Sequence, residues 1–388
     1  MQDIKKRVEA KEAELRAIRR ALHQIPEKGF GEHKTAHYVA DRLRSIAEID
    51  VTTGVAETGV VGLLTGRRPG KTLLVRADMD ALPIKEQTGL DFASTHDSMM
   101  HACGHDGHMA MALVAADILA GMRDSFSGAV KFMFQPAEEG PGGAKPMIEA
   151  GVLENPHVDY AVACHVWPGL PSGYLGVKAG VLMAAASSFV ITVTGKGGHG
   201  AMPQLCVDAL DTAVQIAGAL QRLVNQKIDP LHPSVLTVGS LHSGSAPNII
   251  PETAELTGMF RTFDRKTWQA YPAIIEQVAQ GICDSTGASC QCTFSHGYPP
   301  LENDPDMVQV MKKSMEDVVP AHQIVEPEST MGAEDMAFIL EQTKGCYFIV
   351  GTGFKGCAPL HNASFTFDEK SLLPGVETLV RFALNLLG

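Results

Sequence analysis

The sequence predicts an α/β fold: a mixed, mostly parallel sheet between helices, interrupted by an inserted ferredoxin-like α+β domain. Short apolar strand-like runs alternate with helical segments in the first 185 residues and again from residue 298. Such alternation is typical of a parallel sheet covered on both faces. The segment between them has the order β-α-β-β-α-β, which is typical of a compact two-layer domain. We therefore predict a first domain formed by residues 1–185 and 298–388, and an inserted domain formed by residues 186–297.

The elements of the first domain are predicted from apolar periodicity. Its strands are short continuous apolar runs, as expected for strands buried on both faces. Helices are expected at residues 3–24, 106–120, 145–150, 304–318, 333–342 and 369–387, and strands at residues 60–65, 72–77, 129–134, 161–164 and 346–350.

The inserted domain has longer helices and strands that approach strict alternation. Its expected helices are residues 207–226 and 266–285, and its expected strands are residues 188–194, 235–240, 253–262 and 289–295. The turn at residues 195–200 matches G-x-G-x-x-G, but the strand after it offers no acidic residue for a ribose. A dinucleotide site requires that acid, so we interpret the glycines as a turn.

Composition excludes several classes of function. The net charge of −12 over 388 residues argues against a nucleic-acid partner, which would require a basic face. No run of 18 apolar residues predicts a membrane span, and the first twenty residues are too charged for a secretory signal. Eight scattered cysteines indicate reduced thiols rather than a disulfide framework. We therefore expect a cytoplasmic protein.

Potential metal ligands crowd into the segment His101-Ala-Cys-Gly-His-Asp-Gly-His108. Cys103 and His105 lie two residues apart just before a predicted helix, so both side chains can reach one ion. Thiolate and imidazole together suit a borderline-soft metal such as Zn²⁺. The alternative is a structural turn in which Asp106 caps the helix.

Other polar side chains follow or end apolar strands. Adjacent glutamates, Glu138 and Glu139, follow one strand; one can bind a metal while the other stays free as a base. His165 ends another strand, and Asp78 and Asp80 close a third, where one of them can orient a ligand histidine. Considered alone, each feature has a purely structural explanation. The glutamates can belong to a charged loop, His165 can be a buried core histidine, and the aspartates can cap a loop.

Taken together, these strand ends predict one metal site at the carboxyl edge of the sheet. With His361 near the C-terminus, the candidate ligands are Cys103, His105, Glu139, His165 and His361. A single zinc ion uses three or four protein ligands, so five fit two ions better.

The motifs resemble the dinuclear-metal amidohydrolases that include hippurate hydrolase, N-acyl-L-amino acid amidohydrolases and auxin–amino-acid conjugate hydrolases. These are relatives of aminoacylase and of glutamate-releasing carboxypeptidases. The resemblance runs nearly end to end and is specific for the family but weakly specific for the substrate. It is carried by RADMDALPI (76–84), HACGHDGH (101–108), FQPAEEG (134–140), HVWPGLP (165–171), GKGGHGAMP (195–203) and SAPNIIP (245–251).

The resemblance implies roles for the candidate residues. The five ligands fall on the family's metal ligands, Glu138 falls on the general base, and Asp80 is similar to the aspartate that orients the site. His199 resembles a histidine that steadies the substrate oxyanion and that can come from a partner subunit. Asn248 and Arg261 match positions that contact the carboxyl end of the substrate. The inserted domain is then a dimerisation or lid domain, and a homodimer or a dimer of dimers is expected.

The sequence also departs from the family pattern. Gln204 stands where histidine is usual, residues 184–189 lack an acidic residue, and residues 331–336 replace a commoner Gly-Ser-Glu-Asp-Phe. None of these positions is a candidate ligand, so they bear on substrate preference.

The expected activity is hydrolysis of N-acyl (N-acetyl, N-benzoyl or similar) amino acids with two divalent ions, Zn²⁺ first and Mn²⁺, Co²⁺ or Ni²⁺ as alternatives. A dipeptidase or small carboxypeptidase using the same site is the alternative activity. A non-catalytic metal-binding protein on the same fold is the alternative of another class.

Overall fold

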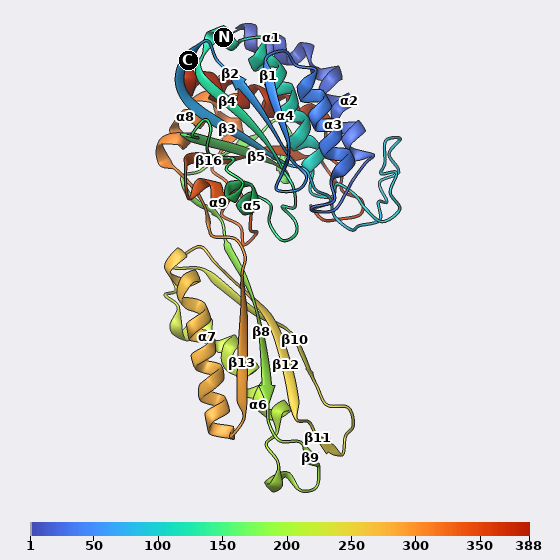
Figure 1. Cartoon of the computed structure of the whole chain (residues 1–388), viewed down its shortest axis with the longest axis vertical. Coiled ribbons are helices and arrows are strands. Elements are labelled where there is room, and N and C mark those ends of the chain that lie inside the picture. Colours follow the sequence, from blue (N-terminus) through green and yellow to red (C-terminus); the bar gives the residue numbers. More distant parts are fainter. Residues whose placement is uncertain (1) are drawn as a thin grey trace. The chain divides into compact units, whose positions relative to one another are not determined.

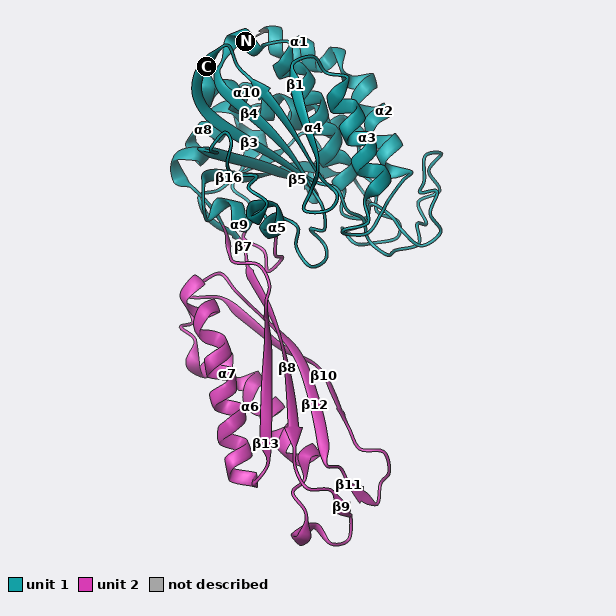
Figure 2. Ribbon diagram, in the orientation of Figure 1, with its two compact units in different colours: residues 1–182, 302–328, 335–388 teal, residues 183–301, 329–334 magenta. Residues whose placement is uncertain are grey.

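The computed structural model describes residues 2–388 and divides the chain into two compact units (Figure 2). Unit 1 comprises Met1–Leu182, Glu302–Glu328 and Asp335–Gly388, and unit 2 comprises Met183–Leu301 and Ser329–Glu334.

Unit 1 is built on an eight-stranded mixed sheet. The four central strands, β4, β3, β5 and β16, are mutually parallel, and β1 and β2 add an antiparallel edge. The central strands are apolar and buried along most of their length, as expected where helices and loops cover a sheet. The order across the sheet is β1 (Ile49–Val55), β2 (Gly59–Thr65), β4 (Ser127–Gln135), β3 (Arg68–Asp78), β5 (Tyr160–Pro171), β16 (Lys344–Gly353), β6 (Leu175–Gly176) and β15 (Ile324–Val325).

Helix α4 (His105–Ala120) is the central helix of unit 1. It is buried on nearly all sides because its residues are small or apolar, and it packs against α2, α10 and β3 (Figure 1). The other helices of unit 1 are α1 (Gln2–Ala10), α2 (Glu12–His23), α3 (His33–Arg44), α5 (Ala144–Glu149), α8 (Pro305–Glu316), α9 (Ala337–Leu340) and α10 (Leu372–Leu387), with short 3₁₀ turns at Arg123–Ser125, Ala321–Gln323 and Glu369–Ser371.

Two element predictions in unit 1 were wrong, and two elements were missed. The single helix expected at residues 3–24 is two helices, α1 and α2, separated at Lys11. The helix expected at residues 333–342 shrinks to α9, because the Asp335 carboxylate accepts hydrogen bonds from Gln135 and the backbone N–H of Ala144. Helix α3 and strand β1 were not predicted.

Unit 2 contains a four-stranded antiparallel sheet of order β10-β12-β8-β13 with two helices packed against it. Asp208 and Asp264 cap the two helices by accepting backbone N–H groups of the first turn. The chain order β-α-β-β-α-β confirms the ferredoxin-like prediction. The elements are β8 (Ala185–Thr194), α6 (Ala209–Lys227), β10 (Ser234–Ser243), β12 (Thr253–Thr262), α7 (Arg265–Thr286) and β13 (Ser289–His296).

A two-stranded ribbon extends unit 2 beyond one end of this sheet. Strand β9 (Gly198–His199) pairs with β11 (Ile249–Ile250), followed by a 3₁₀ turn at Pro203–Leu205. The glycine-rich segment is therefore a turn and ribbon, as predicted, rather than a nucleotide loop. Near the unit boundary, β7 (Gly180–Met183) and β14 (Leu301–Asn303) form another small sheet. Among the described helices, none combines the length and apolarity needed to cross a bilayer.

Candidate metal centre

The first two candidate ligands flank the start of α4. Gly104 has φ +90°, a left-handed conformation that side chains rarely adopt, and a Cβ there would lie 2.3 Å from Cγ2 of Val166. This turn places Cys103 immediately before the helix and His105 on its first residue.

The remaining candidates lie at or after the carboxyl ends of β3 and β4, within β5, and in the loop after β16; His165 was predicted to end its strand, but β5 continues to Pro171. Asp78 ends β3 and pairs with Gln135, which ends β4, and Glu138 and Glu139 follow. His165 lies on β5 opposite Ile349 of β16. His361 lies in the loop after β16 with φ +62°, an uncommon conformation for a residue other than glycine, which often marks a functional position.

The structure brings all five predicted ligands and Glu138 into one cluster. Cys103 Sγ lies 3.3 Å from Nε2 of His165. Oε1 of Glu139 lies 2.9 Å from Nε2 of His361 and 4.0 Å from Nε2 of His105. Three overlapping sets have ligand atoms within 4.8 Å of one another: Cys103, His105 and His165; Cys103, Glu139 and His361; and His105, Glu138 and Glu139.

The histidine tautomers leave nitrogen lone pairs free for a metal. His105 Nδ1 donates to the carbonyl oxygen of Asp80 at 2.9 Å, and His165 Nδ1 donates to that of Val166 at 2.6 Å. In the neutral form of each ring, Nε2 therefore carries the lone pair, and this atom faces the cluster. Among residues 2–388, Nε2 of His105 is one of the buried side-chain atoms without a hydrogen-bond partner. Buried polar atoms without partners are rare, and this donor set fits divalent metal ions.

The electrostatics of the cluster also favour a cation. Burial lowers the pKa of His105, but the negative charges of Asp78, Asp80 and Glu139 outweigh burial and raise it to about 10. Burial, followed by the charges of Glu139 and Glu138, raises the pKa of the Cys103 thiol well above its usual range. The cluster thus concentrates carboxylates in a buried place, where a bound divalent ion would neutralise them and favour the Cys103 thiolate.

Asp80 holds the glutamate pair in place. Its two carboxylate oxygens accept the backbone N–H groups of Glu138 at 3.0 Å and Glu139 at 2.9 Å. Together with the bond from His105 to its carbonyl, these contacts join a base candidate and two ligand candidates to one aspartate.

A supporting network surrounds Asp78, one of the two aspartates predicted to orient a ligand histidine; the sequence did not predict the part that His108 and Arg76 play in it. His108 Nδ1 donates to Asp78 at 2.6 Å, while its Nε2 accepts the backbone N–H of Val166 at 2.9 Å. Asp78 also accepts a bond from Arg76 at 2.7 Å. Ligand atoms of Asp78, His105 and His108 also lie within 4.8 Å of one another, but Asp78 and His108 are already hydrogen-bonded to each other. The feature of the sequence that could have indicated this network is the crowding of histidines in residues 101–108.

The three remaining candidates belong to unit 2. His199 is exposed on β9, and its Nδ1 accepts the N–H of Ala201 at 3.0 Å, which leaves Nε2–H as the donor. Asn248 is also exposed, and its carbonyl accepts the N–H of Gly200, so it shares the ribbon with His199. Arg261 lies near the end of β12 and donates to the carbonyl of Met331 at 2.6 Å.

Arg261 and the ribbon lie at opposite ends of the unit 2 sheet. The ribbon continues from the end of β8 and the start of β12, where Thr194 pairs with Thr253. Arg261 lies eight positions after Thr253 on β12, and at about 3.3 Å per residue this distance is roughly 26 Å.

Comparison with known proteins agrees with this geometry. The chain matches the sequence profile of peptidase family M20/M25/M40 over residues 74–385. The chain belongs to this family. Membership in the family and the clustered ligands make it a metal-dependent amidohydrolase, as the motifs predicted.

Relatives cover nearly the whole chain. Thermostable carboxypeptidase 1 of Saccharolobus solfataricus is 40% identical over 92% of this chain and 91% of its own length. The N-acyl-L-amino acid amidohydrolase of Geobacillus stearothermophilus is 41% identical over 78% of this chain and 81% of its own. Among solved structures, the Bacillus subtilis YXEP protein, a dinuclear metal binding peptidase of the M20 family, superimposes with a TM-score of 0.86 at 34% identity, covering 98% and 99% of the two chains.

Proposed function

We propose that the protein hydrolyses the amide bond of N-acyl amino acids and releases a carboxylic acid and an amino acid. The proposal depends mainly on the position of Glu138. This carboxylate is 8% exposed, lies among five other ligand candidates and is not needed to complete the ligand set. A structural metal site has no use for a spare buried base.

The proposed ligands of two divalent ions are Cys103, His105, Glu139, His165 and His361. The thiolate favours Zn²⁺, while the carboxylate and imidazoles also suit Mn²⁺, Co²⁺ or Ni²⁺. When bound, the ions supply Lewis acidity that activates water and polarises the amide carbonyl.

In the proposed reaction Glu138 acts as general base and then as general acid. It takes a proton from the attacking water as the new C–O bond forms, and it delivers that proton to the amide nitrogen as the C–N bond breaks. Asp80 keeps Glu138 in position through the backbone N–H bond described above. His199 donates its Nε2–H to the oxyanion that develops on the carbonyl oxygen.

Asn248 and Arg261 are proposed to bind the free carboxylate of the substrate. A guanidinium fork matches a carboxylate, which favours N-acyl amino acids over internal peptide bonds. Because Asn248 and Arg261 lie at opposite ends of the unit 2 sheet, one copy of unit 2 is too long to place both on one carboxylate. We therefore propose a homodimer in which His199 and Asn248 act in the partner's site.

The dimer has a direct test. We expect separate Glu138→Gln and His199→Ala proteins to be nearly inactive, and mixed dimers of the two to regain activity at one of their two sites. If mixing restores nothing although exchange of subunits is demonstrated, His199 acts within its own subunit.

The reaction class is tested by removing metal with a chelator and reloading the protein with Zn²⁺, Mn²⁺, Co²⁺ or Ni²⁺. The substrates are N-acetyl amino acids, N-benzoylglycine, indole-3-acetyl amino acids and dipeptides. Metal-restored cleavage of acyl conjugates is the expected result. Restored cleavage of dipeptides alone would favour the second candidate, a dipeptidase or small carboxypeptidase, which the relative named as a carboxypeptidase supports.

A further inference from the structure

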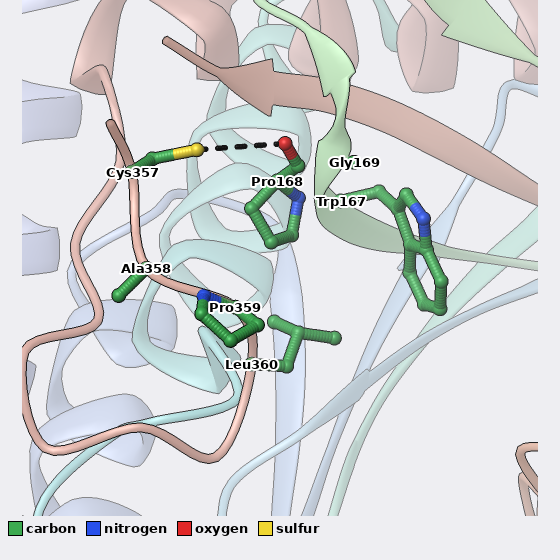
Figure 3. Close-up of a pocket in the computed structure, with 7 residues that line it drawn as sticks. All are labelled: Trp167, Pro168, Gly169, Cys357, Ala358, Pro359 and Leu360. Carbon is green, nitrogen blue, oxygen red and sulfur yellow. Dashed lines mark hydrogen bonds between the residues drawn. The ribbon is translucent and has the colours of Figure 1, made fainter. Parts of the chain in front are cut away.

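An apolar hollow of about 460 Å³ opens in unit 1 between residues 167–169 and residues 357–360 (Figure 3). The first segment is the end of β5 and the second is the loop after β16. The Cys357 thiol donates to the carbonyl of Pro168 at 3.6 Å, so one hydrogen bond joins the two walls. The volume of the hollow falls in the range of about 300–1,000 Å³ that is typical of small-molecule sites.

Both walls of the hollow lead directly to the metal centre. The ring of Trp167 meets the ring of His165 edge-on, with centroids 5.8 Å apart. Leu360, on the opposite wall, immediately precedes His361. Each wall of the hollow therefore adjoins one proposed ligand, His165 through the ring contact of Trp167 and His361 along the chain.

The lining determines which chemistry the hollow accepts. It consists of an indole, two prolines, a leucine, an alanine, a glycine and a thiol, and it contains no charged side chain. It offers no cation to the carboxylate of an amino acid, so the leaving half of an N-acyl amino acid does not suit it. The acyl half is uncharged and suits it well, because apolar surface is stabilised by burial against these side chains.

We propose that this hollow is the acyl subsite and that it selects aromatic or other bulky apolar acyl groups over acetyl. The proposal rests on the proposed function, since it concerns the same site. Trp167 and Leu360 are its specificity-determining residues, and Cys357 is a thiol exposed to the bound acyl group.

The first experiment fills the hollow. Ala358→Phe adds a ring at a lining position that is neither the proposed base nor a proposed ligand, and Ala321→Phe makes the same change at an exposed alanine of unit 1. We expect Ala358→Phe to lower the ratio of kcat/KM for N-benzoylglycine to kcat/KM for N-acetylglycine by about 10-fold or more, since methylene-sized changes in apolar pockets act on that scale. Ala321→Phe should leave the ratio as it is in the parent. An unchanged ratio in folded Ala358→Phe would overturn the proposal.

The second experiment does not depend on turnover. Iodoacetamide alkylates thiols, and the rate at Cys357 can be followed by peptide mass spectrometry in the metal-loaded protein. We expect benzamide to slow alkylation of Cys357 several-fold and acetamide to have no effect. The partly exposed thiols Cys206, Cys290 and Cys292 of unit 2 serve as internal controls, and their rates should not change.

The two experiments separate the two proposals. Protection by benzamide in a protein that cleaves no acyl conjugate would retain the apolar subsite and overturn the proposed function. Metal-dependent cleavage of acetyl and benzoyl substrates without protection by benzamide would retain the function and overturn the subsite.

Discussion

The metal centre of unit 1 and the ribbon of unit 2 hold their candidate residues in different ways. In unit 1 the side chains of Cys103, His105 and His165 are buried, and each imidazole is held by a hydrogen bond from Nδ1 to a backbone carbonyl. In unit 2 His199 and Asn248 are exposed on a two-stranded ribbon, and backbone pairing is their main support.

This difference shows which groups need a precisely fixed position. Groups that must hold metal ions and transfer protons are positioned within a few tenths of an ångström, which requires packing and second hydrogen bonds. Groups that meet a substrate from outside tolerate an exposed position. We therefore expect substitutions in unit 1 to affect the chemical step and metal affinity, and substitutions in the ribbon to affect transition-state stabilisation without disturbing the metals.

The largest effect is expected for Glu138→Gln. The amide cannot accept the proton of water, so kcat should fall about 10³-fold or more. Elemental analysis should still find the parent's metal content, because Glu138 is not one of the five proposed ligands. Glu149→Gln, an exposed glutamate on α5, is the matched control. Normal activity in Glu138→Gln would show that another group is the base.

His199→Ala tests the ribbon side of the comparison. Loss of an oxyanion donor should lower kcat about 10²-fold. Because His199 is exposed, the thermal midpoint should stay within about 1 °C of the parent, as is usual for surface substitutions. His242→Ala, at another exposed histidine of unit 2, should change neither quantity. A loss of bound metal in His199→Ala would contradict the expectation that substitutions in the ribbon do not disturb the metals.

His108→Ala tests the network behind the ligands. It removes the bonds to Asp78 and to the Val166 backbone, which also receives the bond from His165. Metal affinity, measured by competition with a chelator, should fall about 10- to 100-fold. His108→Gln offers an amide oxygen to the Val166 N–H and should recover part of that loss. Equal affinity in all three proteins would make the network a packing feature only.

Glu86→Gln asks whether a second buried polar network of unit 1 contributes to stability rather than to chemistry. Burial raises the pKa of Glu86, but hydrogen bonds from His23, Thr88 and the Ser94 backbone outweigh burial and lower it from 4.5 to about 2. A depressed carboxyl pKa contributes stability above the unfolded value, and that stability is lost as pH falls through the folded value.

The lowered pKa of Glu86 determines the expected effect on stability. Glu86→Gln should lower the free energy of unfolding by about 1–2 kcal/mol at pH 7, with metal affinity unchanged. The gap between variant and parent should shrink between pH 4.5 and about 2. Denaturant unfolding at several pH values measures the difference in stability between the two proteins. A difference that does not depend on pH would contradict a stabilising role for the ionised Glu86.

The sequence alone determined the fold class, the inserted domain and the candidate ligands, because these signals are local. Apolar runs and helical periodicity lie within windows of about ten residues, and ligands that follow parallel strands must meet at one edge of a sheet. The exposed strand β1 and the polar helix α3 carry weaker local signals, since much of each faces solvent, and both were missed.

Only the tertiary structure decided the rest. Asp78 and His108 lie thirty residues apart, and their contact depends on how α4 packs against the end of β3. Other contacts between distant segments were equally invisible in the sequence: His105 Nδ1 donates to the carbonyl of Asp80, and the Asp335 carboxylate accepts from Gln135 instead of lying in the predicted helix. The physical reason is that a hydrogen bond depends on tenths of an ångström between atoms from distant segments, whereas a sequence pattern specifies only which residues lie on the same face of one element.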